Sequence, residues 1–177
     1  MELYFVRHGQ THYNQLGLCN DDPSRPVFLT PEGIRQAEAA AERLRHAALA
    51  RIICSPLPRT HQTAEIINHY HDAPVESHAD INDIRSGFDG RPVSEYFAAT
   101  AHDPLHARVN GGESLLDHKQ RVEGFLDWLK HQPQPSILVV AHEETLRVVK
   151  AYFEGGIPDA RLRDIQIANC QVLHYRS

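Results

Sequence analysis

Leu3-Tyr4-Phe5-Val6 is a short apolar run that leads directly into the polar segment Arg7-His8-Gly9-Gln10-Thr11. Two later runs, at 52–54 and 137–141, have the same character. All three are continuous rather than alternating with polar residues, which is typical of strands covered on both faces of a parallel sheet. A helical pattern follows each run within a few residues. The sequence therefore predicts a three-layer α/β domain with a mostly parallel central sheet.

Capping residues mark where the helices begin. Thr30 is a candidate N-cap with Pro31 at the first helical position, and Ser114 is a candidate N-cap for a later helix. A helix is predicted to open at Ser55 and another to follow the run 137–141. After Thr30, apolar side chains expected to face the core repeat at helical spacing: Ile34, Ala37, Ala41, Leu44 and Ala48. Residues 165–175 are predicted to form one or two strands with a turn.

Composition narrows the class of protein. With 177 residues, 41% hydrophobic and 23% charged, the chain matches an ordinary single globular domain. The net charge of -5 argues against a nucleic-acid binder, and no apolar run approaches the ~20 residues of a membrane span. Cys19, Cys54 and Cys170 are odd in number and far apart, so neither disulfides nor a cysteine-rich zinc site is expected. A cytoplasmic location is the expectation.

Polar residues that suit a phosphate follow each of the three apolar runs. The first run leads to Arg7 and His8, the second to Arg59 in the first turn of a helix, and the third to His142. In open α/β sheets, ligands bind beyond the carboxyl ends of the strands, so these side chains should meet at one pocket. Guanidinium groups and helix N-termini both bind phosphate oxygens well. The sequence therefore predicts a phosphate pocket.

His8 is the candidate nucleophile in this pocket. A neutral imidazole can attack phosphorus, and neighbouring cations disfavour its charged form. Gly9 is expected to let the backbone approach the phosphate closely. Phosphoryl transfer then needs a proton donor for the leaving oxygen, ideally a carboxyl group.

Five motifs occur in a characteristic order along the chain: Arg7-His8-Gly9-Gln10-Thr11 with Asn14, Leu29-Thr30-Pro31-Glu32-Gly33 with Gln36-Ala37, Ser55 to Ala64, Gly111-Gly112-Glu113-Ser114, and Val139-Val140-Ala141-His142. In these motifs the chain resembles the histidine phosphatase superfamily (branch 1), also called the phosphoglycerate mutase-like family, and above all its small phosphatases. The resemblance extends from Met1 to about Leu173. It implies an α/β/α sandwich that forms one domain over 1–177, with a short insertion at about 79–112 over the active site.

The resemblance also implies roles for individual residues. His8 would carry the phosphoryl group as a phosphohistidine, while Arg7, Arg59 and His142 complete the phosphate pocket. Asn14 would be an additional phosphate contact, although a turn-capping role is an alternative for it. No metal ion or cofactor is implied.

The proton donor has two candidates. The family's acid segment corresponds to Ile81-Asn82-Asp83-Ile84-Arg85-Ser86-Gly87, which places Asp83 at the acid position. Glu143 directly follows the pocket histidine and is the rival, because a distant branch of the family has its acid there. Asp83 is preferred. Glu113 is expected either to supply charge at a helix start or to contact the site.

The leading function is hydrolysis of a small phosphorylated metabolite by a monomer or homodimer that binds neither nucleic acid nor membrane. A phosphoglycerate-type mutase is the first alternative, and a catalytically weak regulator that binds a phospho-ligand or phosphoprotein is the second. The substrate is left open. Four basic residues were candidates for binding a second anionic group of the substrate: Arg85, Arg91, His106 and Arg108.

Overall fold

A computed structural model describes residues 1–177, which are built around a five-stranded sheet with the strand order β3-β2-β4-β1-β5. The strands are β1 (Glu2–Arg7), β2 (Arg51–Cys54), β3 (Val75–Ser77), β4 (Ser136–Ala141) and β5 (Val172–Arg176). β1 to β4 are parallel, and β5 pairs with β1 in the antiparallel sense. The predicted mostly parallel sheet is thus confirmed.

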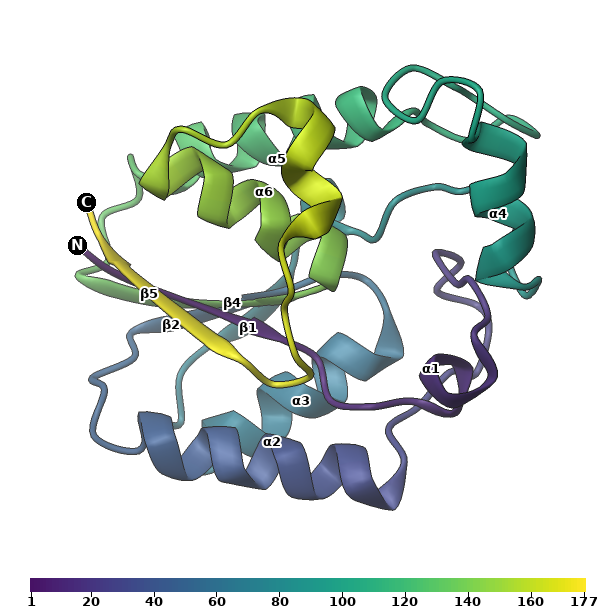
Figure 1. Cartoon of the computed structure of the whole chain (residues 1–177). Coiled ribbons are helices and arrows are strands. Elements are labelled where there is room, and N and C mark those ends of the chain that lie inside the picture. Colours follow the sequence, from purple (N-terminus) through teal and green to yellow (C-terminus); the bar gives the residue numbers. More distant parts are fainter.

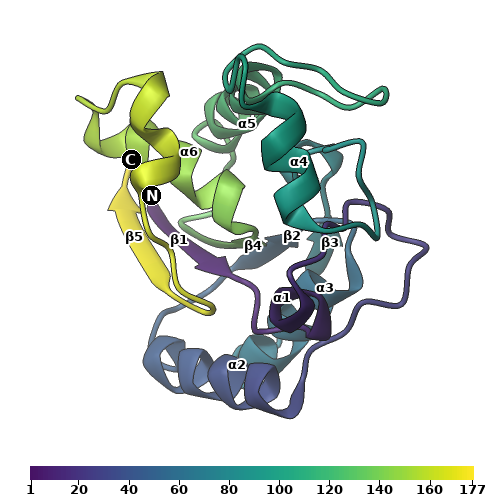
Figure 2. The same cartoon turned by 45° about the vertical axis from the view of Figure 1, so that its right-hand side comes forward.

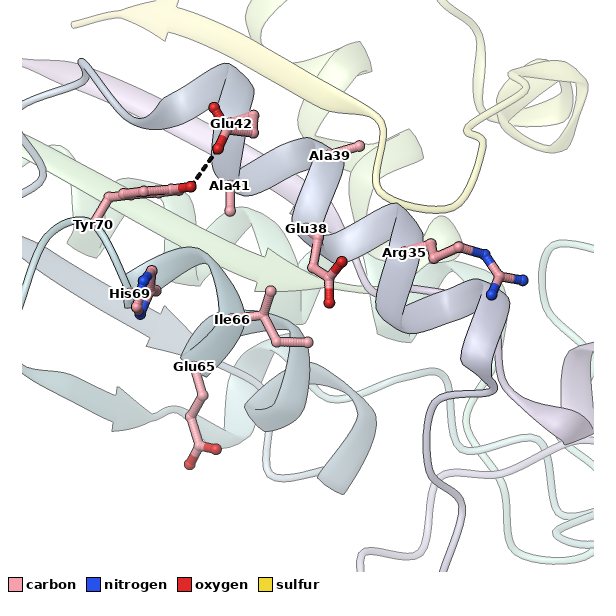
Figure 3. Close-up of a pocket in the computed structure, with 9 residues that line it drawn as sticks. All are labelled: Arg35, Glu38, Ala39, Ala41, Glu42, Glu65, Ile66, His69 and Tyr70. Carbon is pink, nitrogen blue, oxygen red and sulfur yellow. Dashed lines mark hydrogen bonds between the residues drawn. The ribbon is translucent and has the colours of Figure 1, made fainter.

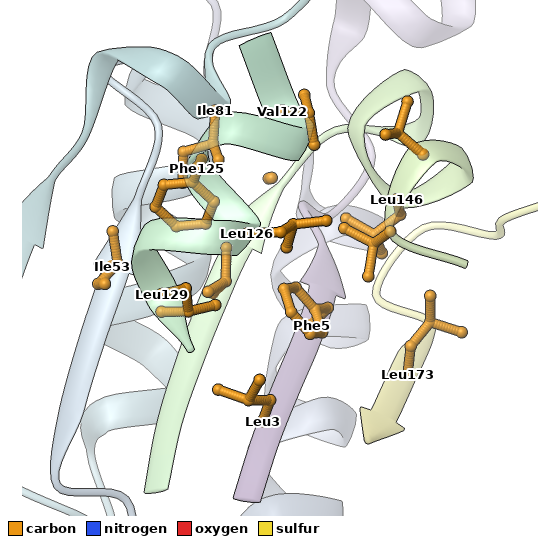
Figure 4. Packing of buried hydrophobic residues seen from close by; sticks show 14 of the residues in the cluster. Leu3, Phe5, Ile53, Ile81, Val122, Phe125, Leu126, Leu129, Leu146 and Leu173 are labelled. Carbon is orange, nitrogen blue, oxygen red and sulfur yellow. The ribbon is translucent and has the colours of Figure 1, made fainter. Parts of the chain in front are cut away.

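Helices cover both faces of the sheet (Figure 1). One face packs against α2 (Pro31–Leu44) and α3 (Pro58–Asn68), and the other against α5 (Leu115–Leu129) and α6 (Glu143–Glu154). Figure 4 shows the core on the α5 and α6 side, where Leu3 and Phe5 of β1 are fully buried. Val6 of the same strand belongs to the core on the other face. Burial on both faces explains the continuous apolar runs in β1, β2 and β4.

Four short elements lie outside these layers: α1 (His12–Leu16), the 3-10 helix η1 (Ala79–Ile81), α4 (Val93–Thr100) and the 3-10 helix η2 (Asp159–Asp164). Figure 2 shows α1 and α4 on the side of the molecule toward which β1 points. No helix is both long and apolar enough to cross a membrane.

The predicted helix starts at Thr30 and Ser114 are confirmed. Thr30 Oγ1 accepts a hydrogen bond from Gly33 N at 3.0 Å, and Ser114 forms a reciprocal capping box with Asp117. The helix expected at Ser55 begins later, at Pro58, because Leu57 has an extended backbone.

The predicted inner face of α2 is wrong at its two ends. Ile34 is 38% exposed, and Ala48 lies beyond the last helical residue, Leu44. Gly33 faces inward instead, where a Cβ would lie 2.1 Å from Gln10 O. This close approach of the helix to the loop after β1 sets its rotation and turns Ile34 toward solvent.

Candidate active site

The three strand ends meet because β4 lies between β1 and β2. His8 follows β1 and His142 follows β4, and their rings are 5.3 Å apart between centroids. Arg59, in the first turn of α3, places its Nε 3.3 Å from His8 Nε2. All three side chains are buried. The structure thus brings together residues that are up to 134 positions apart in the sequence, as expected from the topology.

The His8 ring is oriented by its own loop. Its Nδ1 lies 2.7 Å from the carbonyl oxygen of Gly9, which can only accept, so Nδ1 carries the proton. The Nε2 lone pair then faces Arg59. Burial lowers the pKa of His8 well below its ordinary value, and the charges of Arg59 and Arg7 lower it further. At neutral pH this ring is therefore uncharged, and its Nε2 lone pair accepts a hydrogen bond from Arg59 Nε.

Gly9 has a packing role that the sequence did not predict. A Cβ on Gly9 would lie 2.4 Å from the carbonyl oxygen of Gly33, at the start of α2. The glycine therefore lets the loop after β1 pack against α2. Its N–H is also satisfied within the protein, by Thr63 Oγ1 at 3.1 Å.

Arg59 is held by a partner that the sequence motifs did not identify. Its Nη1 donates to Asn20 Oδ1 at 2.5 Å and its Nη2 to Asn20 O at 2.8 Å. The amide of Asn20 donates in turn to Asp89 Oδ1 at 3.2 Å, and Asp89 also accepts from the backbone N–H groups of Asp21 and Asp22. Asp89 and Asn20 therefore position the guanidinium group of Arg59.

Two nitrogen atoms at the site are buried without a hydrogen-bond partner: Arg7 Nε, which is a donor, and His142 Nδ1. His142 Nε2 lies 2.8 Å from Ser55 Oγ, which itself accepts from Leu57 N. If the Ser55 hydroxyl donates to Nε2, the remaining proton of the ring is on Nδ1 and is free to donate. A buried donor without an acceptor costs about 1–3 kcal/mol, which an anionic ligand at this position would recover.

Asp83 also reaches the site. Its Oδ2 is 3.2 Å from Arg59 Nη2 and 3.8 Å from His142 Nδ1. Burial raises the pKa of Asp83 above its ordinary value, against the opposing charge of Arg59. A carboxyl group that keeps its proton more readily than usual suits proton donation.

Glu143 lies at the same cavity but is bound differently. Its Oε2 is 3.4 Å from Arg7 Nη1, and its Oε1 is 3.1 Å from Arg147 Nη2. Both carboxylate oxygens are therefore engaged by arginines. This arrangement favours a role in holding Arg7 rather than in proton transfer.

Asn14 caps helix α1 and also lines the cavity. Its Oδ1 accepts from Thr11 N at 2.9 Å, while Thr11 Oγ1 accepts from Asn14 N. The amide nitrogen of Asn14 has no partner in the protein, so a ligand contact and the cap are compatible.

Asp83 is carried by a loop that a buried ion pair holds in place. Arg121, on α5, donates from Nη1 to the carbonyl oxygens of Asp80 at 2.7 Å and Asn82 at 3.1 Å. It is paired with Glu113, whose side chain is only 3% exposed. Although burial opposes it, hydrogen bonds from His118 and Arg121 lower the pKa of Glu113 to about 2. Glu113 thus helps Arg121 to hold the loop that carries Asp83, and it does not line the cavity.

We expect Arg121→Met to lower the free energy of unfolding by about 3 kcal/mol, because it removes the closest cation from the buried Glu113 and leaves only the exposed Arg85, at 3.6 Å, as an arginine partner. Urea unfolding measures this change. Arg35→Met on α2 is the matched control, since Arg35 is exposed and pairs only with Glu32; it should stay within about 0.5 kcal/mol of the unchanged protein. Equal effects of the two substitutions on the free energy of unfolding would contradict a structural role for the ion pair between Glu113 and Arg121.

Asp21 makes stability depend on pH. Burial, together with the nearby charges of Asp89 and Asp83, raises the pKa of Asp21 to about 6. Between the pKa of Asp21 in the unfolded chain and pH 6, this group holds its proton in the folded chain but loses it in the unfolded chain. The free energy of unfolding therefore falls as pH rises through that window. We expect Asp21→Asn to stabilise the protein at pH 7.5 by about 1 kcal/mol, allowing for solvent screening, and to have no effect at pH 4.

Urea unfolding at the two pH values tests this expectation. Asp22→Asn is the control, because hydrogen bonds from Ser24 lower the pKa of Asp22 and its removal should give no gain at pH 7.5. A gain from Asp21→Asn that is the same at both pH values would refute the assignment.

A cavity of about 320 Å³ opens beside Arg7, Arg59 and Asp83; the buried His8 and His142 are not among its lining residues. Arg7, Arg59, Asp83 and Asn14 line it, and α4 contributes Val93, Tyr96 and Phe97 to its wall. A wider hollow of about 800 Å³ lies between α2 and α3 (Figure 3), with Ile66, His69 and Tyr70 on its α3 side. None of the candidate site residues lines that hollow. The structure also holds no group of three or more histidine, cysteine or acidic side chains arranged to bind a metal ion.

Comparison with known proteins found a matching family model and similar proteins. The model of the histidine phosphatase superfamily (branch 1) matches residues 3–176. The adenosylcobalamin/alpha-ribazole phosphatase of Salmonella typhimurium is 31% identical over 160 residues, covering 85% of this chain and 78% of that protein. A Yersinia pestis protein named "Probable phosphoglycerate mutase GpmB" is 28% identical over 181 residues, covering 97% of this chain and 83% of that protein.

Solved structures show the same fold. The alpha-ribazole phosphatase from Shigella flexneri superimposes with a TM-score of 0.87 at 27% identity, covering 98% of this chain and 89% of that one. YhfR from Bacillus stearothermophilus has a TM-score of 0.83 at 24% identity, with the same coverage, and its likeness concerns the fold alone.

Proposed function

The chain belongs to the histidine phosphatase superfamily (branch 1), and we propose that it hydrolyses small phosphomonoesters through a phosphohistidine on His8. The observation that carries this proposal is the arrangement around His8. An uncharged imidazole presents its Nε2 lone pair 3.3 Å from Arg59 Nε, while Arg7 Nε and His142 Nδ1 are buried without hydrogen-bond partners, and His142 Nδ1 is a donor when Ser55 donates to Nε2. A phosphoryl group supplies both the electrophile for the lone pair and acceptors for these donors.

The first step is attack by His8 Nε2 on phosphorus. The new bond is N–P, the bond that breaks is between phosphorus and the leaving oxygen, and Asp83 gives its proton to that oxygen. Positive charge that develops on the ring is stabilised by the hydrogen bond from Nδ1 to Gly9 O. Arg7, Arg59 and His142 neutralise the phosphoryl oxygens, which is the main requirement of phosphoryl transfer.

In the second step water attacks phosphorus and the N–P bond breaks. Asp83, now a carboxylate, takes a proton from the water, and inorganic phosphate leaves. His8 returns to its neutral form. The mechanism uses one histidine and one carboxyl group for two in-line displacements. Arg59 donates a hydrogen bond to each of them, to His8 Nε2 and to Asp83 Oδ2.

Phosphate release and isomerisation can be measured in the same reaction. We expect purified protein to release phosphate from a panel that includes p-nitrophenyl phosphate and α-ribazole phosphate. With 3-phosphoglycerate and a bisphosphoglycerate primer, 2-phosphoglycerate should not form faster than phosphate is released. Isomerisation that outpaces release would replace the proposal with a mutase. Phosphate binding without any turnover would replace it with a regulator.

A further inference from the structure

The lining of the cavity combines two kinds of chemistry. Arg7 and Arg59 line it, and Arg59 Nε lies 3.3 Å from His8 Nε2, so the phosphoryl group would bind at these two arginines. The rest of the lining, which we call the leaving-group half, includes Arg147, two carboxylates and five apolar or aromatic side chains: Glu143, Glu144, Leu18, Ile84, Val93, Tyr96 and Phe97. The leaving group therefore meets apolar surface and carboxylates that are paired with arginines.

Every arginine near the leaving-group half is already paired. Arg147 contacts Glu143 at 3.1 Å and Glu144 at 3.5 Å, and its Nε donates to Ile165 O at 2.8 Å. Arg163 binds Glu144 at 2.9 Å and donates to the hydroxyl of Tyr96 at 2.8 Å. No cation remains there to neutralise an anionic leaving group.

The basic residues that the sequence offered for a second anion lie elsewhere. Each of the four has a carboxylate partner within 4.0 Å, and none lines the cavity: Arg85 with Glu113, Arg91 with Glu95, His106 with Asp103, and Arg108 with Asp117. These four residues were considered for a second anion with solvation as the alternative, and their positions do not support an anion site in the cavity. The segment 79–112 contributes apolar and aromatic side chains to the leaving-group half rather than positive charge.

Glu144 favours a leaving group that carries a hydrogen-bond donor. Its Oε2 is buried and has no hydrogen-bond partner, although its Oε1 is bound by Arg163. An ionised carboxylate oxygen accepts hydrogen bonds only, and leaving it unsatisfied in a buried position is costly. A hydroxyl or amine on the leaving group would satisfy it, whereas a carboxylate or second phosphate would be repelled.

We propose that the site selects phosphomonoesters whose leaving group carries no negative charge, presents apolar or aromatic surface, and offers a hydroxyl or amine donor to Glu144. This inference rests on the proposed function, because it assigns the part of the substrate that His8 releases. Glu143 and Glu144 follow the pocket histidine without obstructing phosphate, because arginines hold both carboxylates. Arg7 and Arg147 hold Glu143, and Arg147 and Arg163 hold Glu144.

A matched pair of esters tests the charge rule: 2-phenylethyl phosphate and 2-(4-carboxyphenyl)ethyl phosphate. Their reacting centres are the same, and only the second has an anionic leaving group. We expect kcat/KM to be at least about tenfold higher for the uncharged ester, and Glu144→Gln to reduce that ratio by raising kcat/KM for the carboxylated one. Glu65→Gln, on the exposed side of α3, is the control and should leave the ratio unchanged.

The outcomes separate the two proposals. Equal kcat/KM for both esters, or a preference for the carboxylated one, would overturn the charge rule and leave the phosphatase intact. The ratio in the unchanged protein decides this even if Glu144→Gln does not fold. Hydrolysis of neither ester would overturn the proposed function and the charge rule with it.

Discussion

His8→Ala is expected to reduce phosphate release by at least roughly 10⁴-fold, because it removes the atom that forms the covalent intermediate. The residual pocket would still bind phosphate through Arg7, Arg59 and His142. No neighbouring side chain replaces the lone pair, since Arg59 has none and His142 Nε2 is engaged with Ser55. Phosphate release from 2-phenylethyl phosphate and p-nitrophenyl phosphate measures the loss.

The matched control is His69→Ala at the C-terminal end of α3, where the histidine is exposed and distant from the cavity. It should keep the activity of the unchanged protein. Far-ultraviolet circular dichroism of both variants shows whether the fold is intact. Activity of a folded His8→Ala protein within about tenfold of the unchanged protein would exclude nucleophilic catalysis by this residue.

Asp83→Asn should have an effect that depends on the leaving group. For 2-phenylethyl phosphate, whose alkoxide leaves poorly, we expect kcat/KM to fall by about 10²–10³-fold because the proton donor is lost. For p-nitrophenyl phosphate, whose phenolate leaves readily without a proton, the fall should be less than about tenfold. The ratio kcat/KM is the right quantity, because it reports the step in which His8 becomes phosphorylated and not the later hydrolysis.

Glu143→Gln is the control that separates the two candidate donors. Glu143 holds Arg7, so this substitution should weaken catalysis of both esters to a similar extent. If Glu143→Gln, and not Asp83→Asn, were the variant that discriminated between the leaving groups, Glu143 would be the donor. The distances favour Asp83, which is within 4.0 Å of both Arg59 and His142.

Much of the fold and the centre of the site could be predicted from local sequence. β1, β2 and β4 are covered on both faces, so each contains a continuous apolar run, and a polar residue follows that run: Arg7, Ser55 and His142. Parallel strands bring their carboxyl ends to one edge, which is why Arg7, His8 and His142 could be placed together. β3 could not be found this way, since all three of its residues are exposed and leave no apolar run.

The residues that position the site were missed because their contacts are long-range. Asn20 binds Arg59, which is 39 positions away, and Asp89, which is 69 positions away. Arg121 holds a loop about 40 positions before it in the chain. Neither residue lies in a periodic pattern that marks it, and an arginine on a helix is usually a surface residue.

The central claim is that His8 carries the phosphoryl group, and trapping the intermediate tests it most directly. The protein is mixed with a phosphomonoester labelled in its phosphoryl group, quenched in alkali after a short time, digested and mapped by mass spectrometry. The account predicts an alkali-stable, acid-labile phosphoryl group on the peptide that contains His8, and none in His8→Ala. Label on another residue would contradict this account. Turnover by the unchanged protein without a labelled peptide at any time would also contradict it, because water would then attack the substrate directly.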